Sequence, residues 1–118
     1  MSKILIVDDD EIISNILATV LEKEGYTVKR IEDGKYAVRT IKEFAPDLVL
    51  LDIFMKDQEG IGTLFELKST FPSLIIVMIS SDEFYGDTAV NAGANCFLKK
   101  PISNDKLIQT VSKLLQEA

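Results

Sequence analysis

The sequence contains no histidine and only one cysteine, Cys96, among its 118 residues. Without histidine the chain cannot build an imidazole-based catalytic triad, use the commonest zinc ligand, or donate a phosphoryl group from phosphohistidine. A single cysteine forms no intrachain disulfide, which suits a reducing cytosol, and its apolar neighbours favour a small buried residue. Carboxylates, hydroxyls and lysines are therefore the main candidates for functional groups.

Long hydrophobic runs and positive charge are also scarce. No apolar run approaches the roughly 20 residues that cross a bilayer, and acidic residues from position 8 onward interrupt any secretory signal. Nineteen acidic residues outnumber thirteen lysines and arginines, which gives a net charge of −6. This sign disfavours direct binding to the phosphate backbone of nucleic acids. We therefore expect a cytoplasmic protein that contacts neither nucleic acid nor membrane directly.

Short apolar runs alternate five times with longer amphipathic segments, and no repeat or linker separates them. The runs lie at 3–7, 26–31, 47–51, 74–79 and 95–98. Three of them are almost continuous isoleucine, leucine and valine, which is typical of strands buried on both faces. The run at 26–31 is more mixed and predicts a strand at the edge of a sheet.

The segments between the runs have helical spacing. Apolar residues from Ile12 to Leu21 predict a first helix, which Gly25 ends. A similar pattern at 107–115 predicts a last helix with Ser103 as its N-cap and Asp105 in its first turn. Weaker helical patterns cover 34–44, 60–71 and 84–92.

Five strand–helix units predict an α/β fold, a flavodoxin-like (βα)5 doubly wound five-stranded parallel sheet with strand order 2-1-3-4-5. Such a sheet binds its ligand beyond the carboxyl ends of its strands. The residues that directly follow the first, third, fourth and fifth runs are Asp8, Asp9, Asp10, Asp52, Ser80, Ser81, Asp82, Lys99, Lys100 and Pro101.

Three of these aspartates predict a metal site. Asp52 lies between apolar residues on both sides, where an unpaired carboxylate is costly. The predicted strand order brings Asp52 close to Asp8 and Asp9, and two carboxylates about 4 Å apart repel by roughly 4 kcal/mol at an effective dielectric constant near 20. Mg²⁺ would remove this repulsion, because it takes carboxylate, water and phosphate oxygens. Alternatively, an aspartate cluster before a helix simply caps it.

Four blocks of the sequence carry a family resemblance. "ILIVDDD", "LVLLDIFM…EG", "IIVMIS" and "AGANCFLKKP" resemble the signature blocks of response-regulator receiver domains, the phospho-accepting modules of two-component signal transduction. The resemblance covers essentially the whole chain, and it implies a single receiver domain over residues 1–118 with no output domain. It also implies a phosphorelay role rather than an ordinary enzyme, with a histidine kinase or phosphotransfer protein as donor and a downstream protein as target.

The resemblance also implies roles for individual residues. Asp52 would be the nucleophile that takes the phosphoryl group. Asp9 would bind Mg²⁺ directly, Asp8 directly or through water, and the backbone carbonyl of Phe54 would be a further ligand. Lys100 would pair with the phosphoryl oxygens.

A second set of implied roles concerns the switch. Ser80 would hydrogen-bond the phosphoryl group and move toward it, and Phe97 matches an aromatic switch position. The Lys100–Pro101 peptide bond would be cis. The sequence departs from the family at Lys56, where a proline is frequent, and in the slightly short stretch between Ser80 and Lys100.

Three alternative functions use the same residues differently. A haloacid-dehalogenase-like phosphatase would need a second aspartate as general acid two residues after Asp52, where this chain has Phe54. A flavodoxin-like electron carrier would need a phosphate cradle at the first turn, which three aspartates would repel. A receiver that only binds partners would not need Asp9, Asp52, Ser80 and Lys100 together.

Overall fold

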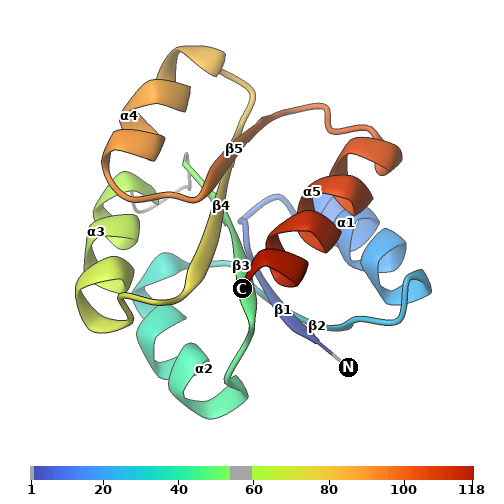
Figure 1. Ribbon diagram of the computed structural model, residues 1–118, viewed down its shortest axis with the longest axis horizontal. Coiled ribbons are helices and arrows are strands. Elements are labelled where there is room, and N and C mark those ends of the chain that lie inside the picture. Colours follow the sequence, from blue (N-terminus) through green and yellow to red (C-terminus); the bar gives the residue numbers. More distant parts are fainter. Residues whose placement is uncertain (1, 54–59) are drawn as a thin grey trace.

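A computed structural model describes residues 2–53 and 60–118. One five-stranded parallel sheet, in the order β2-β1-β3-β4-β5, forms its centre (Figure 1). Its strands are β1 (Lys3–Val7), β2 (Thr27–Ile31), β3 (Leu48–Asp52), β4 (Ile75–Ser80) and β5 (Cys96–Lys99). The observed order confirms the predicted flavodoxin-like topology, and the mixed strand β2 lies at an edge of the sheet, as its composition predicted.

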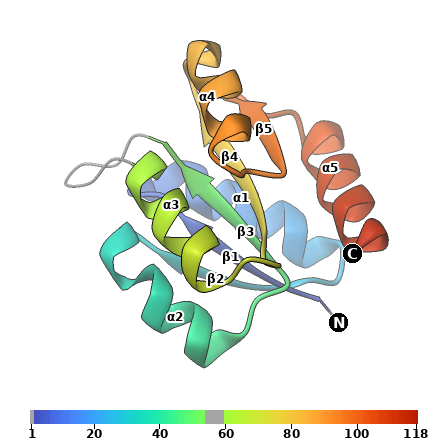
Figure 2. The same ribbon diagram turned by 60° about the vertical axis from the view of Figure 1, so that its left-hand side comes forward.

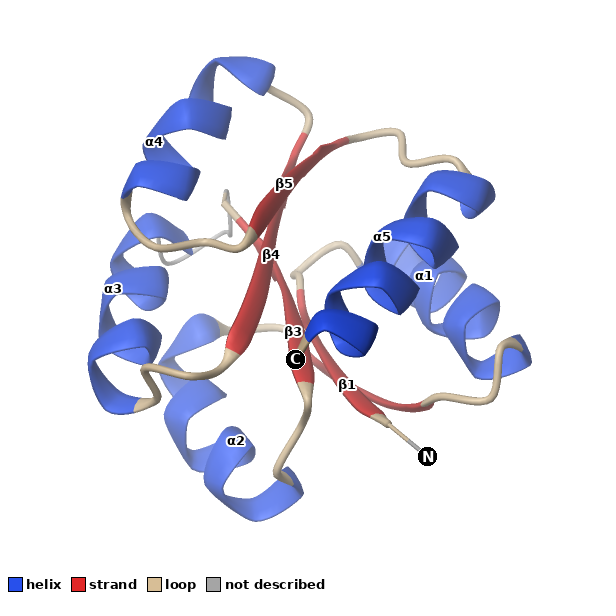
Figure 3. Ribbon diagram, viewed as in Figure 1, coloured by secondary structure: helices blue, strands red, loops and turns tan. Residues whose placement is uncertain are grey.

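Helices cover both faces of the sheet (Figures 1 and 3). They are α1 (Glu11–Lys23), α2 (Ala37–Phe44), α3 (Gly60–Thr70), α4 (Gly86–Asn91) and α5 (Asn104–Glu117). The pair α1 and α5 lies on one face, and α2, α3 and α4 lie on the other, which is the doubly wound arrangement. None of the helices in the described residues is long and apolar enough to cross a membrane.

Local capping sets where the helices begin and end. Asp10 Oδ1 accepts a hydrogen bond from Ile13 N at 3.0 Å, and Ser103 Oγ accepts one from Lys106 N at 3.1 Å. Gly25, with φ of +94°, follows α1 as predicted, in a conformation that disfavours any side chain. The helix predicted at 84–92 is shorter. A 3₁₀ turn, η2 (Glu83–Tyr85), replaces its start because the Asp82 carboxylate accepts a hydrogen bond from Phe84 N.

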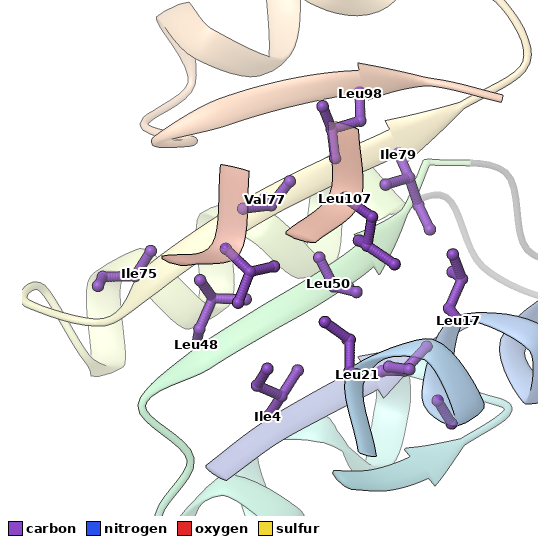
Figure 4. Close-up of a cluster of buried hydrophobic side chains, with 13 residues drawn as sticks. Ile4, Leu17, Leu21, Leu48, Leu50, Ile75, Val77, Ile79, Leu98 and Leu107 are labelled. Carbon is purple, nitrogen blue, oxygen red and sulfur yellow. The ribbon is translucent and has the colours of Figure 1, made fainter. Parts of the chain in front are cut away.

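Two apolar clusters hold the layers together. Figure 4 shows the first, in which Leu21 of α1 and Leu107 of α5 pack on Leu50 of β3 and its neighbours. The second lies on the opposite face and includes Leu64 of α3 and Ala89 of α4. Every residue of β3 is buried. Since each fully buried leucine or isoleucine contributes about 1.5–3 kcal/mol, the sheet is a firm support for the carboxyl ends of its strands.

Candidate functional site

The strands β3 and β4 each end with a predicted site residue. Asp52 is the last residue of β3 and aligns with Ile79, and Ser80 is the last residue of β4 and aligns with Lys99. The apolar runs therefore end one residue earlier than the strands, because the backbone ladder continues past the last apolar side chain. This continuation fixes the backbones of Asp52 and Ser80 within the sheet.

Three carboxylates meet at this edge of the sheet. One oxygen from each of Asp8, Asp9 and Asp52 lies within 4.8 Å of the other two. Asp8 and Asp52 are buried, with 1% and 4% of their surfaces exposed, whereas Asp9 is half-buried. Asp8 is held by its neighbours, since its backbone N donates to Ile31 O at 3.1 Å and its Oδ1 accepts from Asp10 N at 2.9 Å. The convergence predicted from strand order is present.

The Lys100 ammonium lies between the two buried carboxylates. Its Nζ is 2.9 Å from Asp8 Oδ2 and 3.5 Å from Asp52 Oδ2. The backbone of Lys100 is fixed as well, because its N donates to Ser80 O at 2.7 Å, and the Lys100–Pro101 peptide bond is cis. Lys100 therefore connects the ends of β1, β3, β4 and β5.

The charges at this edge do not balance. Burial, followed by repulsion from Asp8, raises the pKa of Asp52 from 3.8 to about 7, although Lys100 opposes both effects. Burial alone would lower the pKa of Lys100. The hydrogen bond to Asp8 and the negative charges of Asp52 and Asp8 outweigh burial, so the pKa of Lys100 is raised. Two buried carboxylates thus share one buried ammonium.

An open cavity of about 460 Å³ lies beside Asp52. Its lining residues are Asp9, Asp10, Ile13, Asp52, Ser80, Ser81, Lys100 and Pro101. The Ser80 Oγ accepts a hydrogen bond from Asp82 N at 3.1 Å. Ile13 was not predicted here, because its place in the helical pattern of α1 indicated the core. The cavity brings the carboxylate of Asp52, the hydroxyl of Ser80 and the ammonium of Lys100 together.

The acidic cluster fits a hard divalent cation. All three side chains offer carboxylate oxygens, the ligands that Mg²⁺ and Ca²⁺ prefer, and they carry more negative charge than Lys100 neutralises. The site therefore has both the ligand atoms and the uncompensated charge for such an ion. Phe54, the predicted carbonyl ligand, and Lys56 lie outside the described residues.

Phe97 lies away from the carboxylates. It is half-buried on β5, and its side chain packs against the apolar cluster that includes Ala89 of α4. The structure thus places Phe97 between the strand that leads to Lys100 and the helix α4. Its role as a switch stays a prediction.

The start of α3 packs directly on the backbone of the proposed acceptor. A β-carbon at position 60 would overlap the carbonyl oxygen of Asp52 and lie 2.8 Å from Cα of Ile53, and Gly60 N donates to Ile53 O at 2.6 Å. We expect Gly60→Ala to lower the free energy of unfolding by about 1–3 kcal/mol, because overpacking against backbone forces the chain to shift. Urea denaturation measures the change.

Gly62 offers a matched control in the same helix. No atom lies within 4 Å of a β-carbon built at this position. Gly62→Ala should therefore raise the free energy of unfolding by up to about 1 kcal/mol, because alanine favours a helix more than glycine does. Similar effects of the two substitutions would show that α3 does not press on Asp52 as described.

Comparisons with known proteins agree with this geometry. Residues 4–112 match the family described as response regulator receiver domain. The chain is 35% identical to the chemotaxis protein CheY of Halobacterium salinarum over 115 residues, which cover 96% of each protein. It is also 35% identical to CheY of Bacillus subtilis over 116 residues, covering 96% of this chain and 97% of that protein.

The chain is also similar to part of a longer relative and to a solved structure. The chain is 37% identical over 110 residues to a putative NtrX-like response regulator of Rickettsia bellii, but it spans only 23% of that protein. The crystal structure of the receiver domain of NtrX from Brucella abortus superimposes with a TM-score of 0.92 at 34% identity, covering 98% of this chain and 99% of that one. These similarities extend over the whole sheet and its helices.

Proposed function

The chain belongs to the response-regulator receiver domain family, the phosphoacceptor modules of two-component signal transduction, and from this membership and the site geometry we propose that Asp52 accepts a phosphoryl group. The donor would be a phosphohistidine on a histidine kinase or phosphotransfer protein. The observation that carries the proposal is the buried Asp52 carboxylate beside an open cavity that Lys100 and Ser80 also line.

In the proposed reaction an oxygen of Asp52 attacks the phosphorus atom of the donor. A bond forms between this oxygen and phosphorus, the bond from phosphorus to the donor's imidazole nitrogen breaks, and the imidazole keeps the electron pair and takes up a proton. The Lys100 ammonium lies 3.5 Å from Asp52 Oδ2 and would neutralise charge on the phosphoryl oxygens. Ser80, which lines the same cavity, would donate its hydroxyl hydrogen to the phosphoryl group.

A divalent cation completes this arrangement. Asp8, Asp9 and Asp52 would hold Mg²⁺, with the carbonyl of Phe54 as the further ligand that the resemblance implies. When bound, the ion supplies positive charge to the phosphoryl oxygens, which is the main need of phosphoryl transfer. The same arrangement would favour attack of water on the aspartyl phosphate, so the domain would also catalyse its own dephosphorylation.

The resulting dianion gives Ser80 and Lys100 a new partner. Such a charge biases the elements that carry these residues, namely β4, β5 and the neighbouring α4. We propose that this change alters the surface offered to a downstream protein. A haloacid-dehalogenase-like phosphatase would need a second acid two residues after Asp52, and the sequence has Phe54 at that position.

Incubation with Mg²⁺ and acetyl phosphate tests the proposal. We expect the intact mass of the wild-type chain to rise by one phosphoryl group, and we expect no increase when EDTA removes the metal or when Asp52 is replaced by asparagine. Asp105→Asn is a matched control, because Asp105 is an exposed aspartate in the first turn of α5 and does not line the cavity. Wild-type protein without the added mass would instead support a receiver that only binds partners.

A further inference from the structure

Lys68, in the last turn of α3, has an ammonium group that is held by neutral oxygen atoms. Its Nζ donates a hydrogen bond to the backbone O of Leu74 at 2.8 Å and lies 3.5 Å from Oδ1 of Asn95. No ion pair joins Lys68 to a carboxylate among residues 2–53 and 60–118. Figure 2 shows this end of α3 beside the short connection to β4. Lys68 therefore ties the end of α3 to the residue that precedes β4.

The aliphatic stem of Lys68 is held as well. A β-carbon at position 93 would lie 3.3 Å from Cγ and 3.5 Å from Cε of Lys68, so the stem packs on the backbone of Gly93. Gly93 has φ of +109°, a conformation that favours glycine and keeps this place free for the stem. Lys68 as a whole is only half-buried, so a small reagent can reach its amine.

These surroundings favour the uncharged amine. Burial lowers the pKa of Lys68, and no carboxylate opposes this effect. The pKa of Lys35 is instead raised, by Tyr36 and by Asp33, whose carboxylate lies 3.6 Å from the Lys35 ammonium. A lysine attacks an electrophile only after it has lost its proton, so Lys68 has the larger reactive fraction at a given pH.

We propose that Nζ of Lys68 is an acylation site for small acyl phosphates. The uncharged amine attacks the carbonyl carbon of the reagent, and a bond forms between this carbon and nitrogen. The bond from the carbon to the phosphate oxygen breaks, the phosphate leaves with the electron pair, and the nitrogen releases one proton to water. The inference goes beyond the proposed function, because the reaction occurs at carbon rather than phosphorus and at the opposite end of the strands from Asp52.

Acylation would loosen the junction between α3 and the start of β4. The amide that forms is uncharged and has one N–H, whereas the ammonium has three, so it cannot serve both Leu74 O and Asn95 Oδ1. Asn95 Oδ1 also accepts a hydrogen bond from Ile76 N at 2.9 Å, and Asn95 N donates to Ile76 O at 2.8 Å. We therefore expect hydrogen exchange of the Ile76 amide to become faster by about tenfold, which corresponds to the loss of one hydrogen bond from a charged group.

Limited reaction of the folded chain with acetyl phosphate near pH 8, followed by peptide mapping, tests the proposal. We expect Lys68 to be acetylated several-fold faster than Lys35, and the two rates to become similar in urea. Asn95→Asp places a carboxylate beside the ammonium and keeps an acceptor for Ile76 N, so it should slow acetylation of Lys68 several-fold. Asn104→Asp is the matched control, because it adds the same charge at the start of α5, on the opposite face of the sheet.

Two variants of Lys68 test the structural consequence. Lys68→Gln removes the charge and should speed exchange of the Ile76 amide, whereas Lys68→Arg keeps the charge and should match the wild type. Acetylation of Lys68 that is no faster than that of Lys35, or that Asn95→Asp does not slow, overturns the inference, and unchanged Ile76 exchange in Lys68→Gln overturns its structural consequence. Acetyl and phosphoryl groups differ in mass and lie on different residues. A chain that is acetylated at Lys68 but takes up no phosphoryl group at Asp52 therefore overturns the proposed function alone.

Discussion

Asp52→Asn is expected to stabilise the metal-free protein by about 2–4 kcal/mol near pH 8, although it removes the side chain proposed to react. Burial, with repulsion from Asp8 as the second cause, raises the pKa of Asp52 from 3.8 to about 7 in the folded protein. Between these two values the folded state keeps a proton that the unfolded state has released. Wild-type stability therefore falls as pH rises through this interval, by up to about 1.4 kcal/mol per pH unit. Asparagine stays neutral and avoids this penalty.

Urea denaturation between about pH 4 and pH 8 measures the effect. The difference between Asp52→Asn and wild type should be small near pH 4, grow up to about pH 7, and then level off, because the carboxylate is fully ionised above its folded pKa. Asp105→Asn is the control for removal of one exposed carboxylate, because Asp105 lies in the first turn of α5 and does not line the cavity. A difference that does not depend on pH would contradict the raised pKa of Asp52.

Mg²⁺ should reduce the difference in stability between Asp52→Asn and the wild type. A cation that binds the folded state stabilises it by mass action, and the wild-type cluster has one more charged ligand than Asp52→Asn. Adding Mg²⁺ near pH 8 should therefore raise the free energy of unfolding of the wild type more than that of the variant, and EDTA should restore the original gap. An equal response of both proteins would argue against Asp52 as a ligand.

The sequence was sufficient to predict the fold because its local signals agree with one another. Nearly continuous apolar runs indicated strands buried on both faces, the mixed run at 26–31 indicated an edge, and Ser103 and Gly25 marked helix ends. The acidic cluster followed from strand order alone, because carboxyl ends of neighbouring parallel strands meet at one edge. Each of these features depends on residues that are close in sequence or on topology.

Features that depend on distances between side chains were not predictable in this way. Strand order placed Lys100 near the site, but not between Asp8 and Asp52, because the path of a long side chain depends on the cavity around it. The shortened α4 follows from the cap that Asp82 provides, which competes with a helical start. The closeness of Gly86 and Phe97 arises from packing between two residues eleven positions apart in sequence, and it leaves no local signal.

Lys100→Met is expected to destabilise the metal-free protein by about 3–5 kcal/mol near pH 8, because it removes one partner of a buried ion pair and leaves charge uncompensated. Lys100 Nζ is the cation at 2.9 Å from Asp8 and 3.5 Å from Asp52, and both carboxylates are almost completely buried. Methionine keeps most of the side-chain volume, so the loss reports on charge more than on packing. Lys99→Met is the matched control, since Lys99 is half exposed and pairs with Glu83 across 3.7 Å at the surface. Such pairs contribute no more than about 1 kcal/mol.

The pH and metal dependence of Lys100→Met distinguishes lost charge compensation from a general packing defect. Lys100 lowers the pKa of Asp52, so its removal lets Asp52 hold a proton to higher pH, and the destabilisation should shrink as pH falls toward about 5. Mg²⁺ should also recover part of the stability, because a divalent cation beside Asp8 and Asp52 replaces the missing positive charge. Adding Asp52→Asn to Lys100→Met should recover stability in the absence of metal for the same reason. A loss that is constant with pH and indifferent to Mg²⁺ would mean that Lys100 supports the fold through packing rather than by holding two carboxylates together.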